Sequence, residues 1–224
     1  TPVEIRDPDA PMAIPGPRAD VALVEFRDVS FQYQRGEPVL RNVSFAVSEG
    51  ERVAIVGVTG AGKTSVLALL RRFYEPTAGR VLVRGIEVNR AAPSDLRRLI
   101  VGVEQEPTLF AGSLDFNLHL GDDCLTRADC DSALLAVQAS DLRNRSEVAE
   151  RGANLSVGEK QLITFARALV RNPALLLLDE ATSHVDPETE SRLQHATSTL
   201  LTGRAAIVVA HRLSTVRNVD RVIV

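Results

Sequence analysis

The apolar positions of this chain predict strands first and then alternating strands and helices. Apolar runs at residues 22–26, 29–31 and 39–47 predict three strands with no helix between them. From residue 53 onward, short β-branched or leucine-rich runs alternate with segments whose apolar residues recur at helical spacing. The first group indicates an antiparallel β-subdomain, and the alternation indicates a mostly parallel sheet covered by helices.

The later strands and helices carry clear local signals. Residues 112–171 are helical by pattern, and two capping boxes open helices there, one from Thr126 and one from Ser156. Asp186 followed by Pro187 is typical of a further helix start. The helix after residue 62 is expected to run through Phe73. The predicted later strands are 53–56, 80–83, 100–103, 175–178 and 205–210.

Both ends of the chain differ from its middle. Residues 1–20 contain five prolines and no hydrophobic periodicity, so they predict a semi-extended linker. Residue 1 is Thr, and residues 221–224 read as part of a strand. We therefore expect this chain to be a piece of a longer protein, truncated at its C-terminal end.

Composition narrows the class of protein. A chain of 224 residues is long enough for one α/β domain with a subdomain, and its net charge of −3 gives no reason to expect a nucleic-acid partner. No apolar run approaches the roughly 18 residues of a membrane span. Cys124 and Cys130 lack a second Cys/His pair, which disfavours a zinc site and suits reduced thiols in a cytosolic environment.

The run Gly57-Val58-Thr59-Gly60-Ala61-Gly62-Lys63-Thr64 fits the P-loop pattern G-x-x-x-x-G-K-[ST]. It stands between a β-branched strand and an apolar-periodic helix, as a P-loop requires. Glycines let backbone N–H groups converge on phosphate oxygens, and the helix start adds further donors. Lys63 would contact the β- and γ-phosphates, and Thr64 would offer its hydroxyl to Mg²⁺. A glycine-rich turn without a ligand would not explain why the P-loop pattern occurs between a strand and a helix.

Other polar residues follow the predicted strands. Gln105, the Asp179-Glu180 pair and His211 each come at the end of an apolar run. Ligands of a doubly wound sheet collect at the carboxyl ends of its strands, so these residues are expected to face one site. Asp179 would hold Mg²⁺ through water, and Glu180 would orient the attacking water or accept its proton.

The predicted helix start at Ser156 has two interpretations. Ser156 and Glu159 form a capping box that needs no ligand, whereas an exposed helix N-terminus with Ser156 and Gly158 can also bind an anion. Both interpretations can hold together.

Taken in order, these motifs resemble the nucleotide-binding domain of an ABC transporter of the exporter type, from Val21 to Val224. The resemblance rests on the P-loop, on Gly102 to Pro107, on Leu155-Ser156-Val157-Gly158-Glu159-Lys160-Gln161, on Leu175 to Asp186 and on Ala210-His211-Arg212. It implies a P-loop NTPase (RecA-like) core with a mostly parallel sheet, an antiparallel β-subdomain and a helical subdomain at about 108–171. It also implies that residues 1–20 connect to a preceding membrane domain.

The resemblance further implies a head-to-tail dimer with the same or a related chain, in which each ATP lies between one P-loop and the partner's Ser156 and Gly158. Glu180 would be the catalytic base, with His211 at the γ-phosphate and Gln105 at Mg²⁺ or the attacking water. The cycle would power substrate export from the cytoplasmic face of a membrane, through a transmembrane domain. Residues implied to contact nucleotide are Tyr33 on adenine, Gly57, Thr59, Gly60, Ala61, Gly62, Lys63, Thr64 and Ser65 on phosphates, and Asp186 between the two sites.

The sequence departs from the usual pattern of the family in three places. Val157-Gly158-Glu159 stands where Gly-Gly-Gln is more common, His184 replaces a small residue, and residues 140–152 form a shorter stretch than exporters typically have. These departures favour one half of a heterodimeric or tandem exporter. Two alternatives are a soluble ABC-type ATPase of DNA repair, chromosome structure or translation, and a nucleotide-gated binding module with little hydrolysis.

Overall fold

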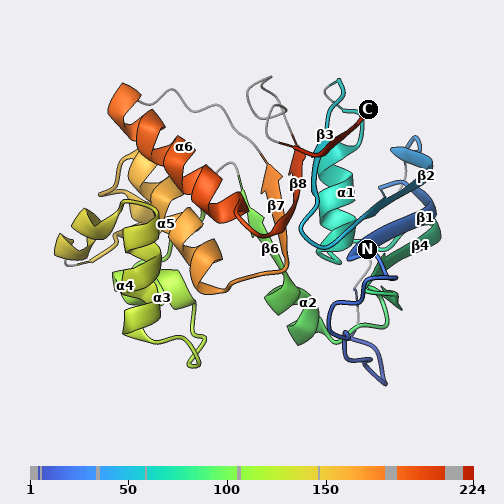
Figure 1. The fold of residues 1–224 in the computed structure, drawn as a ribbon, viewed down its shortest axis with the longest axis horizontal. Helices are drawn as coiled ribbons and strands as arrows, with labels where there is room; N and C mark the ends of the chain where they lie inside the picture. The colour runs from blue at the N-terminus through green and yellow to red at the C-terminus, as the bar shows by residue number, and fades with distance from the viewer. Residues whose placement is uncertain are drawn as a thin grey trace. The chain divides into compact units, whose positions relative to one another are not determined.

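The computed structural model describes residues 5, 7–33, 36–58, 60–104, 107–145, 147–179, 186–209 and 219–224. The chain divides into two compact units (Figure 1). The first comprises Thr1–Val101, Ala174–Asp179 and Arg204–Val224, and the second comprises Gly102–Pro173 and Glu180–Gly203. Each unit has its own cluster of buried apolar side chains.

A five-stranded sheet of order β6-β7-β8-β3-β9 forms the centre of the first unit. β3 lies between β8 and β9 and is parallel to both, and β7 is parallel to β8. Every residue of β8 is buried, which explains why the strand is apolar without alternation. The strands are β3 (Arg52–Ile55), β6 (Ile100–Val103), β7 (Leu175–Asp179), β8 (Ala205–Val209) and β9 (Arg221–Ile223).

An antiparallel sheet of order β2-β1-β4-β5 completes the strands of this unit. β1 (Val24–Phe31) is one strand where the apolar runs predicted two, because shifts in register with both neighbours carry it past Asp28, whose φ is 50°. Its neighbours are β2 (Leu40–Val47), β4 (Ala78–Val83) and β5 (Ile86–Glu87).

The described residues of the first unit form two helices. α1 (Lys63–Leu70) is shorter than the apolar pattern predicted, because Arg72 takes a positive φ and Phe73 lies 54 % exposed beneath the guanidinium of Arg71. α2 (Pro93–Leu99) was not predicted, since only Leu96 within it is buried and no apolar stripe marks it.

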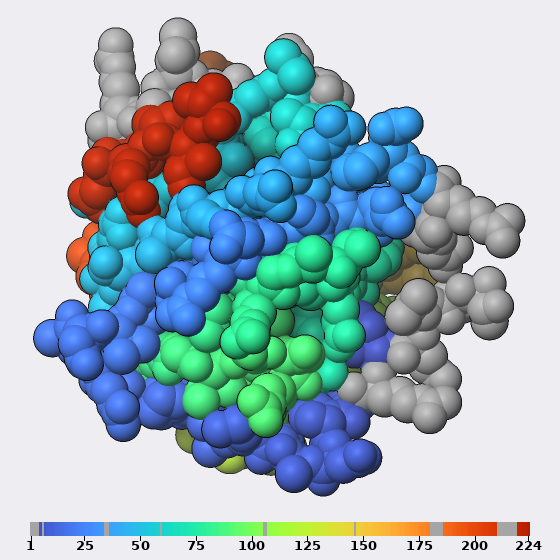
Figure 2. All heavy atoms as spheres, turned by 90° about the vertical axis from the view of Figure 1, so that its right-hand side faces the viewer, coloured from blue at the N-terminus to red at the C-terminus, as the bar shows by residue number. Residues whose placement is uncertain are grey.

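Met12 and Ile14 of the proline-rich segment pack against other parts of the first unit. Met12 forms an isolated parallel bridge with Ala91, and the N–H of Ile14 donates to the carboxylate of Asp95 over 3.2 Å. Ile14 also packs against the apolar core of the unit. Figure 2 shows this N-terminal stretch, in dark blue, beside the green residues around Ala91. The predicted extended conformation is therefore accompanied by specific contacts.

The second unit is helical. Its α-helices are α3 (Leu114–His119), α4 (Arg127–Ala136), α5 (Val157–Val170) and α6 (Pro187–Leu201), with 3₁₀ helices η1 (Ser140–Asn144) and η2 (Glu150–Gly152). Both predicted capping boxes form, at the starts of α4 and α5. The predicted fold class, an α/β P-loop core with an antiparallel sheet and a helical part, is confirmed. Within the described ranges, no helix is long and apolar enough to cross a membrane.

Candidate nucleotide-binding site

The P-loop follows β3 and leads into α1, as the sequence pattern requires. The Ala61 N–H donates to the Val58 carbonyl over 3.1 Å, which makes a tight turn. Gly62 is the N-cap of α1, with a φ of 87°. A Cβ at Gly62 would lie 2.7 Å from Cδ2 of Leu40 and 3.0 Å from Cγ1 of Val39, so both conformation and space require glycine there.

Lys63 is folded over the loop that precedes it. Its Nζ donates to the carbonyl oxygens of Gly57 over 2.8 Å and Val58 over 2.9 Å, and the residue is 7 % exposed. The ammonium group therefore sits beside the loop, where a phosphate bound by the loop's N–H groups would meet it. Gly57, Gly60, Ala61 and Thr64 are exposed.

Asp179 lies near the P-loop along the sheet. It stands opposite Val209 of β8, and Val209 stands opposite Ile55, the last residue of β3. Adjacent strands are about 4.8 Å apart, so the backbone of Asp179 is roughly 10 Å from the end of β3. The carboxyl end of β7 therefore lies at the same edge of the sheet as the end of β3 that leads into the P-loop.

Thr64 and Asp179 are chemically suited to Mg²⁺. A hydroxyl in the first turn of α1 and a carboxylate at the end of β7 are hard oxygen donors. The described part of the chain contains no group of three or more His, Cys, Asp or Glu side chains that could hold a metal by themselves. Such a pair fits an ion that is also bound by waters and substrate phosphates, which is how Mg²⁺ is usually held.

Tyr33 contacts the P-loop helix directly. Its hydroxyl lies 2.9 Å from Oγ of Ser65, which is 4 % exposed. The ring packs edge-on against Phe31 and Tyr74, with centroid distances of 4.8 and 5.1 Å. Tyr33 follows the end of β1 and is 40 % exposed. The structure thus brings it beside α1, a position that its own strand-like pattern did not indicate.

In the second unit, Ser156 caps α5 and is exposed. Its Oγ accepts from the Glu159 N–H over 3.2 Å, and the Glu159 carboxylate accepts from the Ser156 N–H over 2.7 Å. Burial alone would raise the pKa of Glu159, but hydrogen bonds from Ser156 and Arg145 outweigh it and hold the pKa below its ordinary value. Glu159 is therefore an ionised capping residue.

Gly158 has a packing role that the sequence did not reveal. It is buried in the first turn of α5, and a Cβ there would overlap Cγ2 of Thr189 on α6. The Cβ and Oγ1 of Thr189 would lie at 3.4 and 3.7 Å, which are ordinary contact distances. The methyl group of Thr189 therefore occupies the space of the missing side chain.

Asp186 is the N-cap of α6, as predicted. Its Oδ1 accepts from the Thr189 N–H over 3.0 Å, and this backbone hydrogen bond is the main reason that the pKa of Asp186 lies below its usual value. Pro187 occupies the first helical position. Thr189 thus contacts both helix starts: its N–H donates to Asp186, and its methyl group packs against Gly158.

Several predicted site residues lie outside the described residues. These are Thr59 in the P-loop, Gln105, Glu180 and His211. Their proposed roles remain predictions.

Asn117 and Arg167, which no motif in the sequence marks, hold Thr108 and Phe110 in place. Asn117 is fully buried, and its side-chain amide accepts from the Phe110 N–H over 2.9 Å and donates to the Phe110 carbonyl over 2.8 Å. Arg167 of α5 donates to the carbonyls of Asn117 and Thr108. Burial lowers the pKa of Arg167 to about 10, so it stays charged at neutral pH. The sequence could have indicated these two residues only through Asn117 as a polar residue of the short helix α3 and through Arg167 among the apolar residues of α5.

A family model described as ABC transporter matches residues 40–183, which is more than half of the chain. The chain belongs to the ABC transporter family. Its P-loop, Asp179 and the Ser156 helix start all lie within the matched range.

Curated relatives and a solved structure agree with this membership. A probable multidrug resistance ABC transporter ATP-binding/permease protein of Bacillus subtilis is 47 % identical over 90 % of this chain and 31 % of its own length. A β-(1→2)glucan export ATP-binding/permease protein of Rhizobium etli is 43 % identical over 89 % of this chain and 35 % of its own. A bacterial Atm1-family ABC exporter solved with ATP bound has a TM-score of 0.84 and 38 % identity, covering 99 % of this chain and 40 % of that one. The chain spans about one third of the length of these two curated relatives.

Proposed function

We propose that this chain binds and hydrolyses ATP with Mg²⁺, as one of two nucleotide-binding domains that pair head to tail to power export across a membrane. The observation that carries the proposal is the P-loop, where Lys63 is buried against the loop carbonyls at the start of α1. The loop has the exposed backbone and the nearby cation that a triphosphate needs.

Each side chain would have a distinct task in the first unit. The backbone of Gly57 to Ser65 and the ammonium of Lys63 would bind the phosphates, and Tyr33 would stack on adenine beside α1. Thr64 and the water-bridged Asp179 would hold Mg²⁺, which neutralises charge on the β- and γ-phosphates during phosphoryl transfer. Glu180, assisted by His211 and Gln105, would orient the attacking water and accept its proton.

The second unit would serve the nucleotide bound by the partner domain. Ser156 offers an exposed hydroxyl at the start of α5, where N–H groups and the positive end of the helix dipole attract anions. Asp186, at the start of α6, would organise the loop between the two sites. ATP would then hold the two domains together, and hydrolysis would let them separate.

Export is supported by what the relatives are. Two of them are named as ATP-binding/permease proteins, of multidrug resistance and of glucan export, and the solved neighbour is an exporter with ATP bound. With this support, the proposal includes a transmembrane partner and a position at the cytoplasmic face of a membrane. Reading the gene upstream of residue 1 tests it, because about six apolar runs of membrane-spanning length are expected there. A soluble upstream domain would point instead to DNA repair, chromosome structure or translation.

Two variants of the full-length protein test the ATPase. Lys63→Ala should abolish nucleotide binding, because the loop loses its cation. Glu180→Gln should keep ATP binding, lose hydrolysis and accumulate a closed, ATP-bound pair. Glu188→Gln is the matched control, since it removes an exposed acid in the first turn of α6. Unchanged hydrolysis in Glu180→Gln would refute the assigned base, and tight ATP binding without hydrolysis in the wild type would favour a nucleotide-gated module.

A further inference from the structure

Glu159 places a negative charge at the helix end that the proposed function assigns to the partner's triphosphate. It lies in the first turn of α5, three residues after Ser156, and its side chain is 19 % exposed. A carboxylate at this position stabilises the helix through the cap and the dipole. The same carboxylate would repel a phosphate that approaches the N–H groups beside it.

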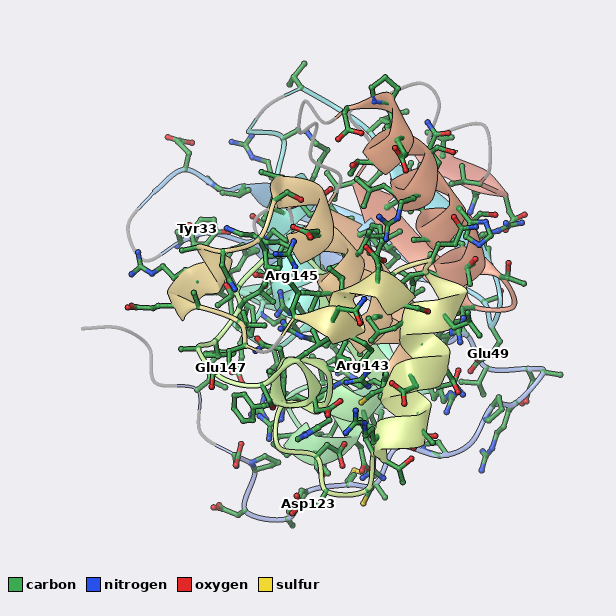
Figure 3. The ribbon with its side chains drawn as sticks, turned by 90° about the vertical axis from the view of Figure 1, so that its left-hand side faces the viewer. Tyr33, Glu49, Asp123, Arg143, Arg145 and Glu147 are labelled. Atoms are coloured by element: carbon green, nitrogen blue, oxygen red, sulfur yellow. The ribbon has the colours of Figure 1, made fainter. Side chains whose placement is uncertain are left out.

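Arg145 lies against this carboxylate. Its Nη2 is 2.7 Å from Oε1 of Glu159, while Oε2 of Glu159 accepts from the Ser156 N–H, also over 2.7 Å. Each carboxylate oxygen therefore has its own donor. Arg145 directly follows η1, and Figure 3 labels it among the side chains of the helical unit.

The loop that carries Arg145 returns to α5 through further hydrogen bonds. Oδ1 of Asn154 accepts from the Ala149 N–H over 2.9 Å, and Nδ2 of Asn154 donates to the Glu147 carbonyl over 2.8 Å. Because Asn154 stands two residues before Ser156, these bonds hold the loop close to the start of the helix. The side chain of Arg145 is 48 % exposed while it pairs with Glu159.

We propose that Arg145 is a positioning residue for ATP-driven pairing of the nucleotide-binding domains: it cancels the charge of Glu159 and so keeps the start of α5 able to receive the partner's γ-phosphate. This inference rests on the proposed function. It also explains how Glu159 is compatible with a phosphate site at a position where the family usually has an uncharged glutamine.

A charge cycle in the full-length protein tests the proposal, with the KM for ATP hydrolysis as the readout. Arg145→Gln leaves Glu159 uncompensated and should raise the KM roughly tenfold, equivalent to about 1.4 kcal/mol. Glu159→Gln keeps an oxygen that can accept from Ser156, and it should stay within about twofold of the wild type. The double variant should return to within about twofold of Glu159→Gln, since the unpaired charge is gone. Arg151→Gln, an exposed arginine of η2, is the control with the same change of net charge.

Salt separates an electrostatic role from a structural one. Raising KCl from about 0.1 M to about 0.5 M should reduce the defect of Arg145→Gln several-fold, because the screening length falls. Equal and salt-insensitive defects in Arg145→Gln and the double variant would overturn the inference while leaving the ATPase intact. Absence of hydrolysis in the wild type and all variants alike would overturn the proposed function and the inference together.

Discussion

The contact between Gly158 and Thr189 makes a quantitative prediction about how α5 and α6 are joined. In Gly158→Ala the new methyl group would overlap Cγ2 of Thr189, whereas the other two nearby Thr189 atoms lie at 3.4 Å or more. Overpacking of this kind typically costs about 1–3 kcal/mol. Alanine in a helix regains roughly 0.5–1 kcal/mol over glycine. The expected net loss of unfolding free energy is therefore between about 0 and about 2.5 kcal/mol, with a central value of about 1 kcal/mol.

A second substitution isolates the cause. Thr189→Ser removes the overlapping methyl group and keeps the N–H that donates to Asp186. By itself it should cost no more than about 0.8 kcal/mol, the value of one buried carbon. Gly158→Ala combined with Thr189→Ser should recover most of the stability lost in Gly158→Ala. Val157→Ala, at a neighbouring position that is 51 % exposed, is the control.

Urea unfolding of the 224-residue chain, followed by far-ultraviolet circular dichroism, measures all four variants. A coupling energy of at least 1 kcal/mol between the two positions is expected from the size of the steric term. If adding Thr189→Ser to Gly158→Ala did not restore unfolding free energy, overlap with Thr189 would not be the reason for glycine at position 158. The proposed contact between the starts of α5 and α6 would then be refuted.

Three further predictions concern individual side chains. Tyr33→Phe and Ser65→Ala each remove the 2.9 Å hydrogen bond and should weaken ATP binding only a few-fold. Tyr33→Ala also removes the aromatic face and should weaken ATP binding more than tenfold. Fluorescence titration with labelled ATP measures the three affinities, and an equal loss of affinity in all three variants would contradict a stacking role. The folded-state pKa of Glu159 lies below its ordinary value of 4.5, so its stabilising effect is complete above about pH 4.5 and is lost as the pH falls through the lower folded value. The melting temperature of Glu159→Gln should therefore fall less on acidification than that of the wild type. Equal falls of the two melting temperatures would argue against the ion pair. Ser156→Ala should lower the unfolding free energy by about 1 kcal/mol through loss of the cap, whereas Ser156→Thr should keep the capping hydrogen bond and most of the stability. An equal loss of unfolding free energy in both variants would argue against capping.

Features with local sequence signals were predictable. The P-loop pattern combines a strand, a glycine-rich turn and a helix within a short stretch, and the capping boxes at Thr126 and Ser156 depend on residues three apart. The position of Asp179 at the end of a central strand was predictable from the four leucines before it, because a continuous apolar run indicates a strand buried on both faces. Ligands of such sheets bind at the carboxyl ends of the strands.

Features that depend on distant residues were not predictable. The overlap of Gly158 with Thr189 and the pairing of Arg145 with Glu159 join different elements, and neither leaves a trace in hydrophobic periodicity. Met12 lies opposite Ala91 through backbone hydrogen bonds with Arg90 and Ala92, which any residue can make. α2 was missed because Pro93 at its start was the main signal and no apolar stripe accompanied it.

The place of β3 in its sheet has a consequence for how the protein is made. β3 is synthesised well before both of its neighbours, β8 and β9. The Arg52 N–H donates to the carboxylate of Asp220, 168 residues away, and the Val56 N–H donates to the Ile223 carbonyl. Pairings of such long separation close slowly and late. During translation, the strand that presents the P-loop therefore lacks both of its neighbours until β8 and β9 have left the ribosome, so the sheet around the P-loop cannot be completed before then.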